Sequence, residues 1–206
     1  MTTDPDELNY LRVIIAKKRK RNSYWSWPDR PIEELGIASS ILRQAGLNVA
    51  GIVSREPGQD PPDCEATLDG RFSGVEVTEL IDRQTLEQSL RGPEVYLVWD
   101  QNALLSALQC RIDAKDRPWK GGPYRCHVLV IHTNEFSLDR ETVARFLKGA
   151  TFRARLLTHV FFGLSYHASD GTSDGCDPVF ALSLISGASA GCTGETSEPR
   201  GSIAEG

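Results

Sequence analysis

Two acidic residues, Asp63 and Glu76, stand on either side of an Asp-Gly pair in the segment PDCEATLDGRFSGVEVTEL, residues 62–80. Asp-Gly is a preferred pair for the two central positions of a tight β-hairpin turn. Counting outward from that turn along an antiparallel register brings Asp63 opposite Glu76. Opposed like charges destabilise paired strands, so the pair predicts a divalent cation or an unusual proton between the carboxylates. The alternative is two solvated side chains without a role.

The alternation of side chains along the two strands predicts one apolar and one polar face for this hairpin. The face expected to be buried carries Cys64, Ala66, Leu68, Val75 and Val77. Glu65 shares the polar face with the two acids and is a weaker substitute as a metal ligand. A hard cation such as Mg²⁺ prefers one or two carboxylates together with waters and substrate oxygens, which this face can provide.

A third carboxylate, Glu34, is predicted to point inward from a helix over residues 31–44. Apolar residues from Ile32 to Ala45 recur at helical spacing, and Glu34 falls inside the arc that they form. An inward carboxylate is either a helix-boundary residue or a site group. A strand over residues 48–54 connects this helix to the hairpin, so Glu34 is a candidate to join the two hairpin acids.

This order of helix, strand and acidic hairpin resembles the PD-(D/E)XK nuclease superfamily. The matching residues are Pro62-Asp63, Glu76-Val77-Thr78 and Glu34. The resemblance implies a restriction-endonuclease-like α/β fold, in which a mixed central β-sheet is flanked by helices. It also implies a metal-dependent nuclease that hydrolyses phosphodiester bonds, in DNA rather than RNA. The metal would be Mg²⁺ or Mn²⁺, held by Asp63, Glu76 and Glu34.

One position departs from the superfamily pattern, because Thr78 stands where its members carry a lysine. That lysine helps to activate the attacking water and to neutralise charge on the phosphate. Some members supply it from a neighbouring helix, and Lys115, late in the segment NALLSALQCRIDAK, is the candidate for that catalytic role. Arg83 is a second candidate for the positive charge. The alternative interpretation of Lys115 is a surface lysine in the last turn of a helix.

A basic run near the N-terminus predicts contact with nucleic acid. It consists of Lys17, Lys18, Arg19, Lys20 and Arg21, and the aromatic residues Tyr24, Trp25 and Trp27 follow it. Basic side chains can contact phosphates while a ring such as that of Trp25 stacks on a base. The alternatives are a solvated helix end and a nuclear localisation signal.

The loop WKGGPYRC, residues 119–126, also combines two basic residues with two glycines. Its backbone could approach a phosphate, and a plain turn explains the same residues. His127 and His132 are expected in the core or at a strand end rather than as metal ligands, because their spacing suits no shared strand face.

Length and composition predict one core domain. The chain has 206 residues, of which 40% are hydrophobic, and a formal net charge of −5. The expected segments are a basic helix with an aromatic linker at 1–30, a nuclease-like α/β core at 31–185 and a disordered tail at 186–206. The odd number of widely spaced cysteines argues against a disulfide framework. No apolar run reaches membrane-spanning length and no secretion signal is present, so a cytoplasmic protein without membrane contact is expected.

Within the core the patterns predict an alternation of strands and helices. Beyond the hairpin, helices are expected at 82–92, 102–115 and 140–149, and strands at 94–99, 126–133, 157–166 and 178–185.

Two other functions stay open on the sequence. One is a catalytically inactive module of the same fold that binds nucleic acid or a protein partner, with Thr78 marking the loss of catalysis. The other is an interaction or immunity-type protein whose acidic hairpin face contacts a basic partner.

Overall fold

The computed structural model describes residues 30–55, 58–82, 98–135, 137–164 and 178–186. Several predictions lie outside these residues: the basic run at 17–21 with Trp25, the alternative cation Arg83, and all of the expected tail except Ser186. No helix among the described residues is long and apolar enough to cross a membrane.

The fold is built on one mixed sheet of six strands in the order β1-β2-β3-β4-β6-β7. These strands are β1 (Val49–Ser54), β2 (Cys64–Leu68), β3 (Arg71–Glu79), β4 (Cys126–Thr133), β6 (His159–Leu164) and β7 (Val179–Ala181). The three central strands β3, β4 and β6 are parallel. Strands β2 and β7 pair antiparallel with β3 and β6, and β1 pairs antiparallel with β2. A second, two-stranded parallel sheet joins β5 (Phe152–Ala154) to β8 (Leu184–Ser186).

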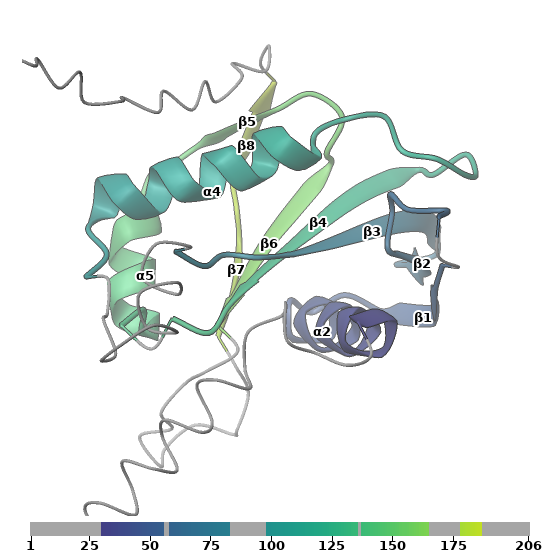
Figure 1. Cartoon of the computed structure of the whole chain (residues 1–206), viewed down its shortest axis with the longest axis horizontal. Helices are drawn as coiled ribbons and strands as arrows, with labels where there is room; N and C mark the ends of the chain where they lie inside the picture. The colour runs from purple at the N-terminus through teal and green to yellow at the C-terminus, as the bar shows by residue number, and fades with distance from the viewer. Residues whose placement is uncertain (1–29, 56–57, 83–97, 136, 165–177, 187–206) are drawn as a thin grey trace, which may run out of the picture.

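Helices cover both faces of the large sheet (Figure 1). Helix α2 (Arg30–Gln44) lies on one face, whereas α4 (Gln101–Lys115) and α5 (Arg140–Leu147) lie on the other. An aspartate caps the N-terminus of both α4 and α5. The Asp100 side chain accepts a hydrogen bond from the Ala103 N–H, and the Asp139 side chain accepts one from the Thr142 N–H. Such caps satisfy N–H groups that the first helical turn leaves unpaired.

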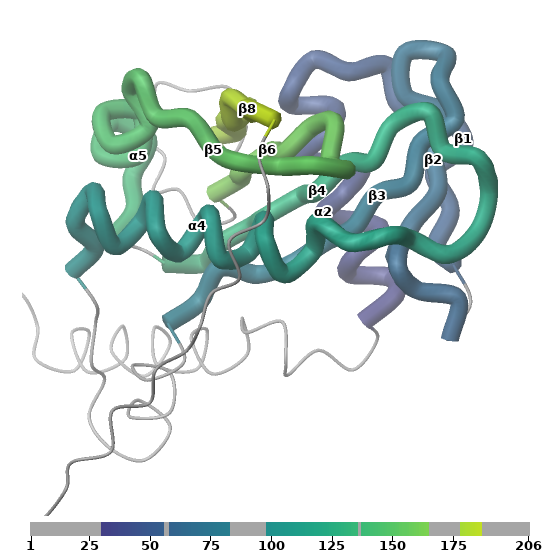
Figure 2. Tube along the Cα trace, turned by 90° about the horizontal axis from the view of Figure 1, so that it is seen from above, coloured from purple at the N-terminus to yellow at the C-terminus, as the bar shows by residue number. Residues whose placement is uncertain are grey.

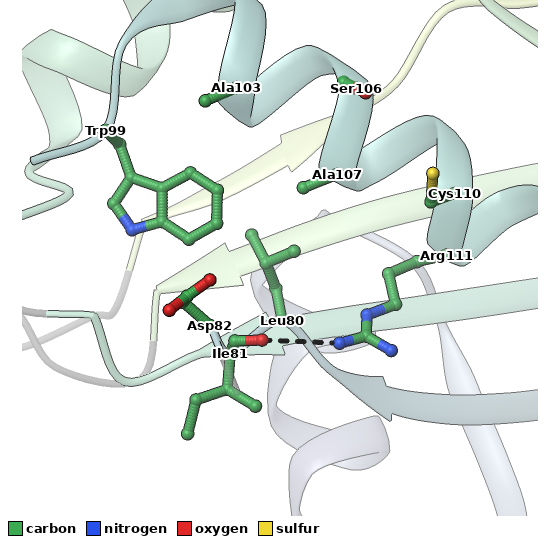
Figure 3. Close-up of a pocket in the computed structure, with 9 residues that line it drawn as sticks. All are labelled: Leu80, Ile81, Asp82, Trp99, Ala103, Ser106, Ala107, Cys110 and Arg111. Carbon is green, nitrogen blue, oxygen red and sulfur yellow. Dashed lines mark hydrogen bonds between the residues drawn. The ribbon is translucent and has the colours of Figure 1, made fainter. Parts of the chain in front are cut away.

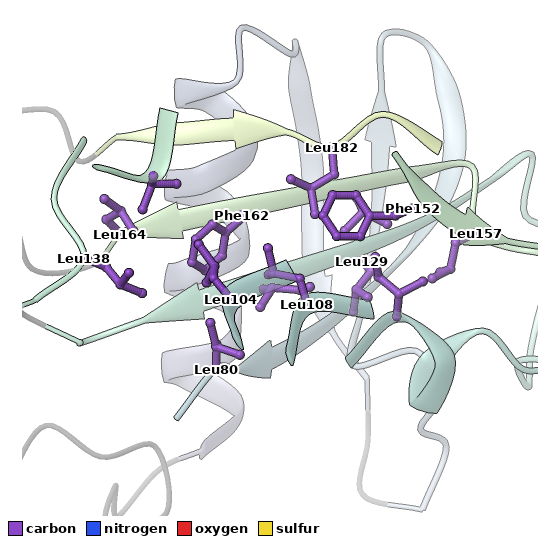
Figure 4. Close-up of a cluster of buried hydrophobic side chains, with 14 of the residues drawn as sticks. Leu80, Leu104, Leu108, Leu129, Leu138, Phe152, Leu157, Phe162, Leu164 and Leu182 are labelled. Carbon is purple, nitrogen blue, oxygen red and sulfur yellow. The ribbon is translucent and has the colours of Figure 1, made fainter. Parts of the chain in front are cut away.

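Two hydrophobic cores follow from this layering. The core under α2 contains Ala38, Leu42, Cys64, Ala66, Val75, Val77 and Val128, and the core under α4 and α5 contains Leu80, Leu104, Leu108, Leu129, Ile131, Val143 and Phe162 (Figure 4). Strand β4 contributes alternate residues to each, because both of its faces are covered by helices. Its continuous apolar sequence is the consequence.

The mixed α/β architecture and most of its elements are confirmed. Helices over 31–44 and 102–115 and strands over 48–54 and 126–133 were expected within one residue of their observed bounds. The predicted strand at 178–185 is instead two strands, β7 and β8, which belong to different sheets. Strand β5 had not been expected. At the end of the predicted strand 94–99, Val98 and Trp99 are in no strand, and Val98 is 86% exposed.

Two local expectations are corrected. Ile32, placed on the apolar side of its helix, is 64% exposed, because the buried positions of α2 begin only at Glu34. Cys64 and Cys126 are free, but Cys110 is disulfide-bonded. Cysteine spacing along the chain carries no information about which residues folding brings together, so the sequence could not reveal this bond.

Candidate functional site

The acidic hairpin has the register that its Asp-Gly turn predicts. Its pairs run from Leu68 with Arg71 to Cys64 with Val75, and Asp69 and Gly70 have φ angles of 47° and 76°. Positive φ at both central positions is the requirement of a type I′ turn, which Asp-Gly meets at low cost. One further step along this register reaches the two acids on which the site prediction rests.

Asp63 lies where β2 separates from β3. The two residues before it are prolines, which have no N–H to donate, so β2 cannot continue the ladder while β3 runs on to Glu79. The N–H of Val77 would therefore lack a strand partner, and the Asp63 carboxylate accepts its hydrogen bond at 2.8 Å. The proline pair thus ends the pairing of β2 with β3 and places Asp63 at the point where the two strands separate.

Glu76 is 2% exposed and lies in the middle of β3. One carboxylate oxygen, Oε1, is 2.5 Å from the Lys115 ammonium nitrogen. The other, Oε2, is buried and has no hydrogen-bond partner among the described residues. A buried carboxylate oxygen without a partner is costly in free energy, so this atom marks a place for a cation or a donor.

Lys115 is the last residue of α4, and its side chain is 22% exposed. It reaches Glu76 from a different element, 39 residues away in sequence. Position 78, where the superfamily pattern carries lysine, is occupied by a half-buried threonine. The ammonium group therefore reaches Glu76 from the helix that covers this face of the sheet, and Lys115 is not the plain surface lysine of the alternative interpretation.

The pKa of Asp63 is raised from 3.8 to about 7. Burial is the largest cause, followed by the negative charge of Glu76, and Glu34 raises it further; the Val77 N–H and Lys115 act in the opposite direction. Two neighbouring acids in a poorly solvated place cannot both ionise easily. Without a cation, Asp63 therefore holds a proton up to about neutral pH.

Glu34 is buried, as its helical position predicts, and its Oε1 is 2.7 Å from Arg30 Nε. Its charge raises the pKa of both Asp63 and Cys64, which places its field at the hairpin acids. However, no group of three or more His, Cys, Asp or Glu side chains among the described residues is arranged to hold a metal ion. Glu34 lies on α2, which covers the opposite face of the sheet from α4, and it acts on Asp63 through its charge without completing the expected three-residue ligand set.

Glu65, which the sequence offered as a weaker alternative metal ligand, contacts Tyr124 and Arg55 instead. Its Oε1 accepts a hydrogen bond from the Tyr124 hydroxyl at 2.5 Å and lies 3.4 Å from Arg55 Nε. Burial, followed by the same hydrogen bond, raises the pKa of Tyr124 to about 12. Sequence reasoning missed these partners, and it also missed Arg30, whose i,i+4 spacing from Glu34 was the available signal.

The two histidines lie in the core and at a strand end, as expected, with His127 half-buried as the second residue of β4. His132 is fully buried in β4, and burial lowers its pKa to about 4. His127 packs against Trp119, with ring centroids 4.9 Å apart.

A separate cavity of about 490 Å³ lies between the end of β3 and α4 (Figure 3). Its lining consists of Leu80, Ile81, Asp82, Trp99, Ala103, Ser106, Ala107, Cys110 and Arg111. None of the predicted site residues lines it. The candidate site is thus the acidic cluster of Asp63 and Glu76 with Lys115, which lies apart from the lining of this cavity.

Comparison of the chain with protein-family models, with curated proteins and with solved structures finds no match.

Proposed function

We propose that this chain is a metal-dependent nuclease that hydrolyses phosphodiester bonds, with DNA as its substrate. The observation that carries the proposal is the contact of the Lys115 ammonium with Glu76 beside Asp63. Two carboxylates and one lysine are the groups that the resemblance to the PD-(D/E)XK superfamily calls for. Lys115 supplies the positive charge that Thr78 cannot.

The residues present fit a hard divalent cation. Asp63 and Glu76 would hold it, since Mg²⁺ needs only one or two protein carboxylates and takes its other ligands from water and substrate. The unpartnered Oε2 of Glu76 is an atom that a cation would satisfy, and the pKa of Asp63 is raised by burial and by the charge of Glu76, which a cation would offset. Bound there, Mg²⁺ or Mn²⁺ would lower the pKa of a water and take up charge on the phosphate.

The chain's own groups have distinct tasks in this reaction. Asp63 must be ionised to act as a ligand, and Glu76 fixes the Lys115 ammonium at the site through a charge-assisted hydrogen bond. Lys115 can orient the attacking water and stabilise charge that develops on the phosphate oxygens. Glu34 adds negative charge that favours a cation, and Arg30 holds its carboxylate in place.

The test is cleavage of DNA by purified protein in Mg²⁺ or Mn²⁺. We expect Glu76→Gln to abolish cleavage, because the amide cannot replace the ionised ligand. Glu79→Gln is the matched control: it is a buried glutamate on the same strand, it alternates to the opposite face, and we expect it to retain activity. Equal cleavage by the Glu76→Gln protein would contradict the proposal.

The alternative is an inactive module of this fold that binds nucleic acid or a protein partner. Thr78 is the observation in its favour, since the superfamily's lysine position is lost. DNA binding by a protein that cuts with neither metal would select this alternative.

A further inference from the structure

The segment between α4 and β4 is a basic loop in an acidic protein. Residues 117–125, RPWKGGPYR, contain three basic residues and no acidic residue, whereas the whole chain has a net charge of −5. Arg117, Lys120 and Arg125 are all exposed. We call residues 117–125 the basic loop.

The basic loop begins immediately after Lys115 and Asp116 and runs alongside the strands that carry the acids. Figure 2 shows this segment passing beside β1, β2 and β3 before it enters β4. The Lys120 N–H donates to the carbonyl of Pro61 at 2.9 Å, two residues before Asp63, and the Arg125 N–H donates to the carbonyl of Phe72 at 2.9 Å. The loop therefore borders the candidate site along the hairpin.

Several contacts hold the basic loop in one conformation. Trp119 packs so closely over Gly74 that a Cβ at that position would lie 3.0 Å from the Trp119 ring. The Tyr124 hydroxyl donates to Glu65, and Arg55 donates to the carbonyl of Lys120 at 2.8 Å. A loop fixed in this way can present its cations without a large ordering cost on binding.

The exposed cations of the basic loop suit a polyanionic ligand, such as the sugar–phosphate backbone of a nucleic acid. Exposed Arg and Lys side chains bind phosphates through charge and hydrogen bonds, and such contacts read no base sequence. The two aromatic residues do not serve as stacking platforms, because Trp119 is committed to Gly74 and His127, and Tyr124 to Glu65. Binding through phosphate contacts alone is expected to be independent of base sequence.

We propose that the basic loop binds the phosphodiester backbone of the nucleic acid as it enters the site, with Arg117, Lys120 and Arg125 contacting phosphates. This inference rests on the proposed function for the nature of the ligand. It assigns the substrate contact to a structured loop that continues directly from the helix bearing Lys115. The rival ligand of the same charge is an anionic lipid surface, which the test below separates from nucleic acid.

The test compares two triple variants that each lose three positive charges. Arg117→Gln/Lys120→Gln/Arg125→Gln removes the cations of the loop. Arg43→Gln/Arg140→Gln/Lys148→Gln removes exposed cations from α2, from α5 and from the residue after α5. Fluorescence anisotropy with labelled mixed-sequence DNA, as duplex and as single strand, measures Kd over a range of KCl in EDTA, where metal-dependent cleavage is absent.

We expect the loop variant to bind at least about tenfold more weakly and to lose roughly 2 to 3 from the slope of log Kd against log salt, as three lost phosphate contacts require. The control variant should match the wild type. Equal affinities and slopes for the two variants would overturn the proposal. So would unchanged DNA binding by the loop variant with lost binding to phosphatidylserine vesicles. Because binding is measured without metal, the two proposals can fail separately. A protein that binds DNA through the loop in EDTA, and still leaves DNA uncut when Mg²⁺ or Mn²⁺ is supplied, would contradict the proposed nuclease activity alone.

Discussion

At the scale of single residues, the ionisable groups of the candidate site interact strongly with one another. Glu76 has one oxygen on Lys115 and a second without a partner among the described residues, and Asp63 is forced toward its neutral form. Removing Lys115 leaves the buried Glu76 carboxylate without its cation, so effects on stability and on activity should appear together.

Lys115 is expected to contribute to both the stability and the activity of the protein. Lys115→Met should lower kcat by about 10² to 10³, the usual loss when a group that stabilises transition-state charge is removed. It should also lower the free energy of unfolding by roughly 3 kcal/mol, because Glu76 is left buried without its partner. In the double variant with Glu76→Gln, the destabilisation should be clearly smaller than the sum of the single effects. Additive losses in urea denaturation would show that the two side chains do not interact.

The pKa of Asp63 predicts how the metal-free protein responds to pH. Because the folded-state pKa is raised from 3.8 to about 7, the folded state binds more protons than the unfolded state across that window. The contribution of this group is therefore complete below pH 3.8 and is lost as pH rises through 7. Mg²⁺ binding below pH 7 must release this proton. Calorimetry in two buffers of different ionisation enthalpy should detect the release in the wild type and not in Asp63→Asn.

At the scale of elements, the hairpin and the basic loop are coupled through one close contact. Gly74 on β3 has Pro62 and Trp119 against it, both 3.0 Å from the position that a Cβ would take. A side chain there has to displace the proline that precedes Asp63 or the indole that anchors the loop. The geometry of the acids thus depends on a residue that carries no charge.

Two Gly→Ala substitutions should consequently act in opposite directions. Gly74→Ala is expected to destabilise the protein by about 1–3 kcal/mol through overpacking and to reduce cleavage. Gly36→Ala, in helix α2 with nothing within 4 Å of its Cβ position, should stabilise it by about 0.5–1 kcal/mol through helix propensity. Thermal denaturation of the pair tests the contact, and a harmless Gly74→Ala would mean that Trp119 is not held against β3.

At the scale of the whole molecule, the central strand β4 carries a buried histidine, His132, whose contribution to stability is lost at acidic pH. Burial lowers the pKa of His132 from 6.5 to about 4, so the unfolded state binds the extra proton between these values. The stability that this creates is complete above pH 6.5 and is lost as pH falls toward 4. The sign is opposite to that of Asp63 over the same range.

The two groups should therefore offset each other in the wild type. In EDTA, His132→Asn is expected to make the free energy of unfolding fall as pH rises from 4 to 7, and Asp63→Asn should make it rise between 4 and 6.5. Urea denaturation at several pH values gives these slopes directly. Identical slopes in both variants would refute the assignment of the titrating groups.

How far the sequence could predict the molecule depended on the range of the interactions involved. The hairpin register followed from two turn residues and the period-two alternation of a strand, and the inward Glu34 followed from helical periodicity. By contrast, residues 178–186 read as one apolar strand, and only pairing with β6 and then with β5 divides them into β7 and β8. Glu65 likewise had no local signal for its bond to Tyr124, 59 residues away.

The sequence by itself determined that two acids face each other where β2 and β3 part, because a tight turn and a pair of prolines act on residues close along the chain. Only the tertiary structure decided that a lysine meets them, and that a basic loop continues from that lysine along the hairpin. The position of Lys115 depends on how α4 packs over the sheet. That packing is set by the core under α4 and α5, which is formed from residues distant in sequence that local patterns do not bring together.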